Sequence, residues 1–277
     1  MTLDPRVTPL RDRLASRELE GLVPAARYVE PERLSVVVPA VPLRRGPDPG
    51  AEQLDHLLFG EAFDVLARDG AYAWGQVRRD GYVGYVDAQA LGQAALLPTH
   101  RVAALRTYAF ERPDFKSAAA GPYSLNSLVT EAARDGRFVK AANGGWFVSE
   151  HLAPVGVFET DVVAVAERLL GAAYLWGGRE ASGVDCSGLL QQALFACGRA
   201  CPRDTDQQAS LGREIDPAQR ARGDLVFWRD HVAIFVDPAR VLHANAHHMA
   251  VVVEPLADVA ARIEASGSGK PTGFRRL

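Results

Sequence analysis

A cysteine behind an aspartate is the residue whose position in this chain most clearly suggests chemistry. Cys186 follows Asp185, a residue type that caps helices, and precedes apolar residues at helical spacing that end at Gly198. We therefore expect a helix to begin at Cys186, where unpaired backbone N–H groups and the helix dipole favour a thiolate. A lone cysteine is more often a packing residue. A thiolate at a helix start becomes a nucleophile when a base is close.

Two histidines further along the chain could supply that base and a partner that orients it. His231 and His243 each lie in a short apolar stretch typical of a strand, and Asp237-Pro238-Ala239 supplies a turn between them. A loop with an odd number of residues puts both histidines on one face as diagonal neighbours, whereas an even loop puts them on opposite faces. Catalysis by a cysteine–histidine pair therefore predicts the odd loop.

Five sequence blocks carry a resemblance to a known family over about residues 157–277. They are Tyr174-x-Trp-Gly-Gly, Asp185-Cys186-Ser187-Gly188, Gly223-Asp-Leu-Val-Phe, His231-Val-Ala-Ile-Phe and His243-Ala. In this order they resemble the core blocks of the NlpC family of papain-like cysteine peptidases. The resemblance implies Cys186 as the nucleophile, His231 as the general base and His243 as the residue that orients it. It implies no cofactor.

The resemblance also implies a reaction, the cleavage of the γ-D-glutamyl–diamino acid bond of cell-wall (murein) peptides. The backbone N–H of Cys186 and the hydroxyl of Tyr174 would meet the oxyanion. Asp230 is a rival to His243 as the orienting residue. It ranks lower because its position next to His231 points it to the opposite face of the strand.

The residues before the peptidase blocks contain two stretches that resemble each other. Residues 74–91 and 138–152 each contain a polar turn followed by glycine, an aromatic residue and valine, which is similar to bacterial SH3 domains. The spacing of the apolar residues before them suggests a short helix. We expect an α+β chain with four parts: a helical arm (1–31), a first SH3-like barrel (32–95), a second SH3-like barrel (96–155) and an NlpC-type peptidase domain (156–277).

This architecture is similar to that of cytosolic γ-D-glutamyl-L-diamino acid endopeptidases, such as dipeptidyl-peptidase VI. The resemblance implies that the first barrel closes one end of the cleft and that the substrate carries a free N-terminal L-alanine. Carboxylates would bind its ammonium group through charge-assisted hydrogen bonds. The positions that match the substrate-binding residues of these enzymes are Glu61, Tyr82, Asp185, Ser187 and Asp204. Asp206 is an alternative to Asp204, because only the local sequence pattern separates the two.

Composition and charge exclude several classes of protein. The 277 residues are 48% hydrophobic and 23% charged, with a formal net charge of −3. The chain therefore lacks the excess of positive charge that favours binding to nucleic acid or to an acidic membrane. The first residues are rich in charge and lack the apolar core of a secretory signal, and three cysteines do not form a disulfide framework. We therefore expect a cytoplasmic enzyme whose partner is a small murein peptide. A monomer is compatible with the sequence.

Three alternatives stay open. A zinc site with Cys186, His231 and His243 as ligands is disfavoured, because a cysteine at a helix start beside a strand pair suits acyl transfer better than a tetrahedral cage. A papain-like amidase or acyltransferase could act on another substrate. An inert binding module is the third alternative. The sequence does not distinguish diaminopimelate from lysine in the third position of the peptide.

Overall fold

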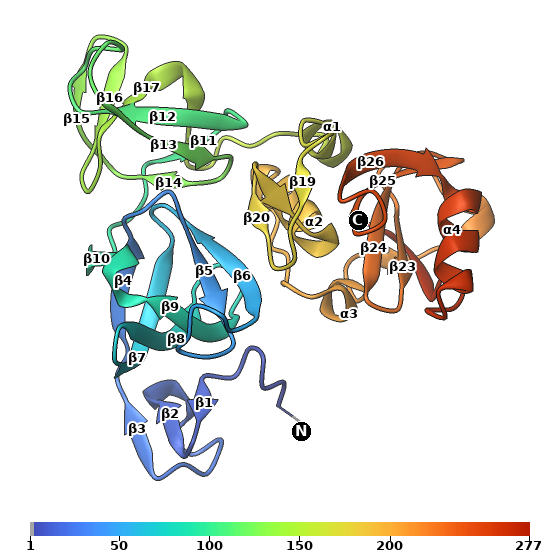
Figure 1. Ribbon diagram of the computed structural model, residues 1–277, viewed down its shortest axis with the longest axis horizontal. Coiled ribbons are helices and arrows are strands. Elements are labelled where there is room, and N and C mark those ends of the chain that lie inside the picture. The colour runs from blue at the N-terminus through green and yellow to red at the C-terminus, as the bar shows by residue number, and fades with distance from the viewer. Residues whose placement is uncertain (1–2) are drawn as a thin grey trace. The chain divides into compact units, whose positions relative to one another are not determined.

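The computed structural model describes residues 3–277 and divides the chain into two compact units. The first unit ends at Val155 and the second runs from Gly156 to Leu277. Figure 1 shows that the first unit consists almost entirely of strands, whereas the second combines strands with helices. The mixture of helices and strands agrees with the predicted α+β class.

The segment before the first barrel consists of strands and not of the helical arm that the sequence predicts. Its elements are β1 (Leu10–Arg11), β2 (Leu14–Ser16), the 3-10 turn η1 (Arg17–Leu19) and β3 (Arg27–Val29). Pro9 lacks the N–H group that a helix interior needs. Asp12 and Arg13 have φ angles of 48° and 73°, and two successive left-handed residues make the tight turn between β1 and β2. The expectation of a helical arm was wrong because turn chemistry overrides apolar spacing here.

Seven antiparallel strands form the sheet of the first barrel, in the order β10-β4-β7-β8-β9-β5-β6. One apolar core lies on the inner side of this sheet, with Phe63, Val36 and Leu43 fully buried. The strands are β4 (Glu32–Val36), β5 (Ala40–Arg44), β6 (Gln53–Leu58), β7 (Ala62–Asp69), β8 (Tyr72–Val77), β9 (Val83–Asp87) and β10 (Leu91–Ala94), with the 3-10 turn η2 (Ala88–Ala90) before β10.

The second barrel is built from a three-stranded and a five-stranded sheet. Its core includes Phe59, which comes from the turn between β6 and β7 of the first barrel and packs edge-on against Tyr123. This ring joins the two barrels within the first unit. The elements are β11 (His100–Val102), β12 (Arg106–Phe110), β13 (Ala119–Ser124), β14 (Leu128–Val129), β15 (Glu131–Asp135), β16 (Phe138–Ala141), β17 (Trp146–Val148), η3 (Ser149–His151) and β18 (Leu152–Pro154).

The second unit is organised around a nine-stranded sheet in the order β20-β21-β19-β26-β25-β24-β23-β27-β22. The central strands β23 to β26 follow one another as antiparallel neighbours. The strands are β19 (Ala173–Tyr174), β20 (Arg179–Glu180), β21 (Gly183–Val184), β22 (Arg213–Glu214), β23 (Leu225–Trp228), β24 (His231–Asp237), β25 (Arg240–Asn245), β26 (Ala250–Pro255) and β27 (Gly273–Arg276). The helices are α1 (Val162–Glu167), α2 (Cys186–Ala196), α3 (Thr205–Gln208), η4 (Pro217–Gln219) and α4 (Leu256–Ala265).

Helix α2 begins at Cys186, as the capping pattern predicts, but it is not amphipathic. Every residue from Cys186 to Ala196 is buried, including two glutamines. The amide of Gln191 donates to the carbonyl of Cys201 at 3.2 Å, and that of Gln192 donates to the carbonyl of Arg179. Because both amide groups donate to backbone carbonyls of the second unit, the helix can lie inside this unit and hold the cysteine in place.

Among residues 3–277, no helix is long and apolar enough to cross a membrane.

Candidate active site

The start of helix α2 is fixed by Asp185 and by two close backbone approaches. One carboxylate oxygen of Asp185 accepts from the Gly188 N–H at 2.7 Å, and the other accepts from the Gly177 N–H at 2.8 Å. A side chain at Gly188 has no room, since a Cβ there would lie 2.1 Å from the carbonyl oxygen of Gly178. The glycine-rich approach segment therefore packs directly on the first turn of the helix and sets the position of Cys186.

The thiol of Cys186 is 8% exposed, and its environment favours the neutral form. Burial raises the pKa of the thiol, and the nearby Asp185 carboxylate raises it further. The backbone N–H groups of Val232 and Ser187 act in the opposite direction, because they donate to the sulfur. The helix start was expected to favour a thiolate when a base is close, and burial acts against this preference by raising the pKa of the thiol. Proton transfer to a base is therefore needed.

His231 and His243 lie side by side on adjacent strands. His231 Nε2 is 2.8 Å from His243 Nδ1, and the ring centroids are 5.0 Å apart. The Val232 N–H that donates to the Cys186 sulfur belongs to the residue after His231, which places the start of β24 against the thiol. The second unit thus brings the cysteine and both histidines together.

The register of β24 and β25 puts His231 and His243 on the same face of the sheet, as predicted. The turn between the two strands, however, is shorter than the predicted odd loop. Ile234 pairs with Leu242, whereas Asp237 pairs with Arg240, so the register shifts by one residue between these pairs. The turn itself therefore contains two residues, an even number, and a bulge at Val236 supplies the odd count. The predicted odd register is present, and its physical source is the bulge.

Asp230 is not placed to orient His231. It lies with a φ angle of 61° in the turn between β23 and β24, and its side chain is 84% exposed beside Arg229. The sequence ranked it below His243 because it was expected on the other face of a strand. The structure places it in a turn instead.

Burial also favours the neutral form of both imidazoles. Desolvation lowers the pKa of His231 to about 3, and the neighbouring His243 contributes to this shift. Desolvation lowers the pKa of His243 as well. A neutral His231 has one ring nitrogen bonded to His243 and leaves Nδ1 as the second, which can accept a proton. A hollow of about 500 Å³ borders His231, His243 and His247.

Tyr174 lies in β19, close enough to the thiol for the two groups to interact electrostatically. Burial raises the pKa of its phenol above the ordinary range, and the charges of Cys186 and Asp185 add to this effect. The hydroxyl therefore stays protonated and can donate a hydrogen bond. This is the property that the predicted oxyanion role requires.

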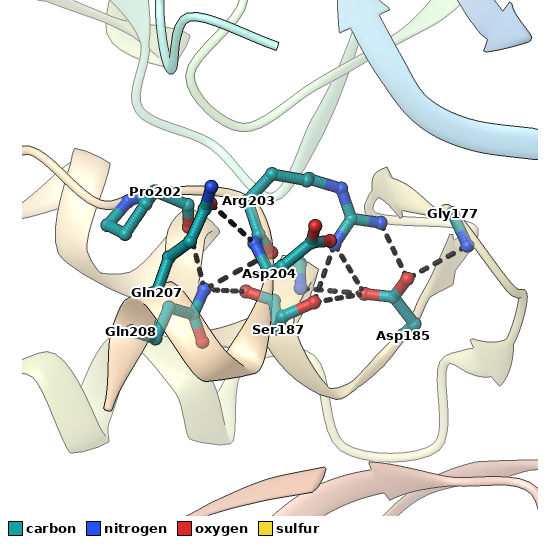
Figure 2. A network of polar contacts seen from close by, with 9 residues as sticks. Gly177, Asp185, Ser187, Pro202, Arg203, Asp204, Gln207 and Gln208 are labelled. Atoms are coloured by element: carbon teal, nitrogen blue, oxygen red, sulfur yellow. Dashed lines mark hydrogen bonds and ion pairs between the residues drawn. The ribbon is translucent and has the colours of Figure 1, made fainter. Parts of the chain in front are cut away.

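A buried arginine that the sequence reasoning missed connects Asp185 with Ser187 (Figure 2). Arg203 donates to the two carboxylate oxygens of Asp185 at 2.5 and 3.1 Å and to the Ser187 hydroxyl at 2.6 Å. Its side chain is 2% exposed. Asp185 and Ser187, predicted as substrate-binding residues, are thus both engaged in an internal network. In this structure the polar groups of both residues hold Arg203 and the start of helix α2 in place.

Asp204 and Asp206 differ in their surroundings. Asp204 is half-buried and caps helix α3, and its backbone N–H lies 3.4 Å from Oε1 of Gln207. Figure 2 shows it directly after Arg203, beside the network around Asp185. Asp206 is exposed. The position next to the network favours Asp204 over Asp206 as a substrate-binding residue.

Glu61 and Tyr82 belong to the first unit and line different hollows there. Glu61 is 1% exposed, accepts from the Leu58 N–H at 3.1 Å and lies 3.6 Å from the Arg79 guanidinium. It borders a hollow of about 310 Å³. Tyr82 is 5% exposed and belongs to the core of the first barrel, at a hollow of about 340 Å³. Their role toward a substrate stays a prediction.

Two residues of this site carry signals that the sequence analysis did not use. Arg203 lies between Pro202 and Asp204, and an arginine next to an acidic residue in a loop looks like a surface position. Glu254 is the acidic residue at the end of the apolar run Val251-Val252-Val253, and a charge in such a strand needs a partner. That partner is His243, at 2.8 Å.

Within the described part of the chain, no group of three or more His, Cys, Asp or Glu side chains is arranged to hold a metal ion.

Two family models match the chain. The NlpC/P60 family matches residues 171–261, which contain the cysteine and both histidines, and the bacterial dipeptidyl-peptidase SH3 domain matches residues 43–91. The chain carries an NlpC/P60 cysteine peptidase domain. The predicted resemblance to the NlpC peptidases is confirmed. The presence of a bacterial SH3 domain in the first unit is confirmed as well.

Curated relatives of this chain include two named dipeptidyl-peptidases. A γ-D-glutamyl-L-lysine dipeptidyl-peptidase of Bacillus subtilis is 33% identical over 30% of this chain and 31% of its own length. Dipeptidyl-peptidase 6 of Lysinibacillus sphaericus is 24% identical over 72% of this chain and 82% of its own. The chain spans 17–48% of the length of several other curated relatives.

A solved structure supports the fold over most of the chain. An NlpC/P60 family protein from Bacillus cereus matches 88% of this chain and 99% of its own, with a TM-score of 0.77 and 19% identity. At this identity the likeness establishes the fold and leaves the substrate to the argument from the site.

Proposed function

We propose that this protein is a cysteine endopeptidase that cleaves the γ-D-glutamyl–diamino acid bond of murein peptides. Its substrates carry a free N-terminal L-alanine, and its product is L-Ala-D-Glu, as peptidoglycan recycling requires. The observation that carries the proposal is the 2.8 Å contact between His231 and His243 beside the first residue of helix α2, Cys186. The names of the two dipeptidyl-peptidase relatives support the choice of bond.

The first half of the reaction is an acyl transfer to sulfur. His231 Nδ1 takes the thiol proton as the Cys186 sulfur attacks the γ-carbonyl carbon of D-glutamate. When the tetrahedral intermediate collapses, the carbon–nitrogen bond breaks and His231 returns the proton to the departing amine of the diamino acid. A thioester between Cys186 and the L-Ala-D-Glu unit is left.

The second half is hydrolysis of that thioester. His231 removes a proton from water, the resulting oxygen attacks the same carbon, and the carbon–sulfur bond breaks with return of the proton to Cys186. In both halves the Cys186 backbone N–H and the Tyr174 hydroxyl donate to the oxyanion. Loss of one such donor typically lowers the rate by about 10²–10³-fold.

The free amine of the substrate is the basis of the proposed specificity. Asp204, Glu61 and Tyr82 are the candidates for binding it, since carboxylates form charge-assisted hydrogen bonds with an ammonium group. Glu61 already lies 3.6 Å from Arg79, so its carboxylate has a competing cation. Asp204 follows Arg203 beside the buried network around Asp185 and Ser187, and on this ground we rank it first of the three candidates.

A reducing compartment suits the proposed enzyme. Cys186, Cys197 and Cys201 are thiols in the structure and not disulfides. Proteins that keep three thiols and no disulfide are typical of the cytoplasm. We propose a cytoplasmic location, where recycled wall peptides with free amino termini are the available substrates.

A paired assay with L-Ala-γ-D-Glu-diaminopimelate, free or acylated at its amino terminus, tests this proposal by mass spectrometry. We expect release of L-Ala-D-Glu from the free peptide and none from the acylated peptide. Equal turnover of both would remove the amine specificity and the roles of Asp204, Glu61 and Tyr82. If neither peptide is cleaved, the proposed substrate is wrong. The corresponding lysine peptide, run in parallel, identifies the preferred diamino acid.

A further inference from the structure

A carboxylate lies at the far end of the histidine pair, on the next strand of the sheet. Glu254 Oε2 is 2.8 Å from His243 Nε2, and the other nitrogen of the same ring faces His231. The three side chains come from three consecutive antiparallel strands, β24, β25 and β26. They form one hydrogen-bonded line that starts at the base and ends at Glu254.

The register explains why these side chains meet. His243 pairs with Val252 and Val241 pairs with Glu254, so Glu254 is a diagonal neighbour of His243 on the same face of the sheet. His231 is the diagonal neighbour of His243 on the other side, where Ile234 pairs with Leu242. A shift of one residue in either pair would turn a member of the line to the opposite face.

The chemistry of the end group determines where every proton in the line lies. An ionised carboxylate can accept but not donate, so His243 must carry its proton on Nε2 and leave Nδ1 as an acceptor. His231 then donates from Nε2 to that acceptor, and its Nδ1 has a lone pair. This is the tautomer that can take a proton from a thiol.

A competing donor makes the carboxylate necessary. The amide nitrogen of Asn245 lies 3.1 Å from His243 Nε2, and the oxygen of this amide accepts from the His248 N–H at 2.8 Å, which fixes its orientation. Without Glu254, Asn245 would donate to Nε2 and drive the proton of His243 to Nδ1. His231 would then accept at Nε2 and hold its own proton on Nδ1, where the base is needed.

Glu254 is held as a carboxylate by the groups around it. The guanidinium of Arg262 donates to its two oxygens at 2.9 and 2.7 Å, and His248 Nε2 lies 3.0 Å from Oε1. Burial opposes ionisation, but the hydrogen bonds from Arg262, His248 and His243 outweigh it and lower the pKa of Glu254 to about 2. The acceptor therefore persists over the whole pH range in which an enzyme works.

We propose that Glu254 is a positioning residue that sets the tautomers of both His243 and His231 and thereby makes His231 Nδ1 the base. The inference rests on the proposed function in that it assigns His231 as the base. Glu254 does not touch the reacting atoms. It acts through His243, in the way that a buried aspartate orients the histidine of other triads.

The variant Glu254→Gln tests this role because it keeps the size of the side chain and adds a donor. Arg262 Nη1 and His248 Nε2 both face Oε1, so we expect the amide oxygen to take that place and the NH₂ group to take the place of Oε2, next to His243 and Arg262 Nη2. Glu264→Gln is the matched control, since Glu264 is exposed on the same helix as Arg262. The proton positions are read from nitrogen-15 chemical shifts of the histidine rings in the intact protein.

We expect the wild type and Glu264→Gln to carry their protons on Nε2 of both rings. In Glu254→Gln both protons should move to Nδ1, and kcat/KM should fall by at least about 10²-fold. Glu254→Asp, which restores an acceptor, should return the protons to Nε2 and recover part of the activity. Unchanged proton positions in Glu254→Gln would overturn the proposal, as would Nδ1 protons in the wild type.

The ring spectra separate this proposal from the proposed substrate, because they need no peptide. If the protons move as expected in a protein that cleaves no murein peptide, the tautomer role stands and the proposed function fails. If the murein peptide is cleaved equally well by Glu254→Gln with unmoved protons, the proposed function stands and the tautomer role fails.

Discussion

Cys186 and His231 are each surrounded by groups that favour the neutral form. The thiol is buried beside the Asp185 carboxylate, which raises its pKa, and desolvation lowers the pKa of the imidazole. These surroundings favour a thiol and a neutral imidazole in the resting site, and in the proposed reaction the proton moves to His231 as the sulfur attacks the substrate. A helix start favours a thiolate when only the sequence is known. The sequence reveals the helix dipole but not the burial that opposes the effect of the dipole on the thiol.

The pH dependence of alkylation tests the state of the thiol. Because the pKa of Cys186 is raised, its rate of reaction with iodoacetamide should increase with pH and inflect above the ordinary cysteine value of about 8.5. Peptide mass spectrometry separates Cys186 from Cys197 and Cys201. A rate that is already constant near pH 6 would show a thiolate and contradict this description of the resting site.

Arg203 is the second residue whose role can be measured. Replacing it with leucine leaves the Asp185 carboxylate buried without its cation, which costs about 3–5 kcal/mol in comparable cases. We expect the free energy of unfolding of the second unit to fall by about this amount in urea titrations. Arg229→Leu is the control, since its pair with Asp230 is exposed, and it should change stability by less than about 1 kcal/mol. Equal effects of both variants would show that the buried network does not stabilise the site.

At the scale of elements, the sequence predicts which strands and helices form but not how they are joined. The start of α2 could be predicted from Asp185, and strands β24 and β25 follow the predicted apolar stretches around His231 and His243. The bulge at Val236 could not, because an extra residue in a strand depends on pairing with β25. The N-terminal strands were missed because left-handed Asp12 and Arg13 are uncommon for such residues.

Gly188 links helix α2 to the segment that precedes it. In Gly188→Ala the new Cβ would lie 2.1 Å from the Gly178 carbonyl oxygen, which is backbone and cannot rotate away. The helix start must shift, so we expect a loss of about 1–3 kcal/mol in stability and a lower kcat. Gly273→Ala is the control, because no atom lies within 4 Å of its added Cβ. Wild-type activity and stability in Gly188→Ala would contradict the described packing.

At the scale of the whole molecule, the neutral buried histidines make stability depend on pH. The pKa of His231 is about 3 in the folded chain and about 6.5 in the unfolded chain, so the unfolded chain binds an extra proton between these values. The contribution of the neutral His231 to the free energy of unfolding is therefore fully present above pH 6.5 and decreases as the pH falls from 6.5 toward 3. His243 adds to the trend in the same direction.

The variant His231→Gln removes the group at which the unfolded chain binds this extra proton. Between pH 6 and 4 its free energy of unfolding should depend on pH less steeply than that of the wild type, by about 1.4 kcal/mol per pH unit. Urea titrations at several pH values measure both slopes. Identical slopes would mean that His231 is protonated in the folded chain at these pH values.

The organisation of the chain follows from the sequence to different degrees in its two units. The peptidase blocks predict the second unit, because the residues that meet there are fixed by local capping and strand pairing. The first unit is harder, since Glu61 and Tyr82 are buried by long-range packing that no local pattern reveals. Arg203 was missed for the same reason, whereas Glu254 carries a local signal, a charge at the end of an apolar run, whose partner only the fold reveals.

The most direct test of the central claim is a search for the thioester on Cys186. The protein is mixed with L-Ala-γ-D-Glu-diaminopimelate, quenched in acid and analysed by mass spectrometry of its peptides, with Cys186→Ala in parallel. We predict that L-Ala-D-Glu is found on the peptide that contains Cys186, and that the variant forms neither this adduct nor the cleavage product. Cleavage of the peptide by Cys186→Ala at the wild-type rate would contradict the claim that this cysteine is the nucleophile.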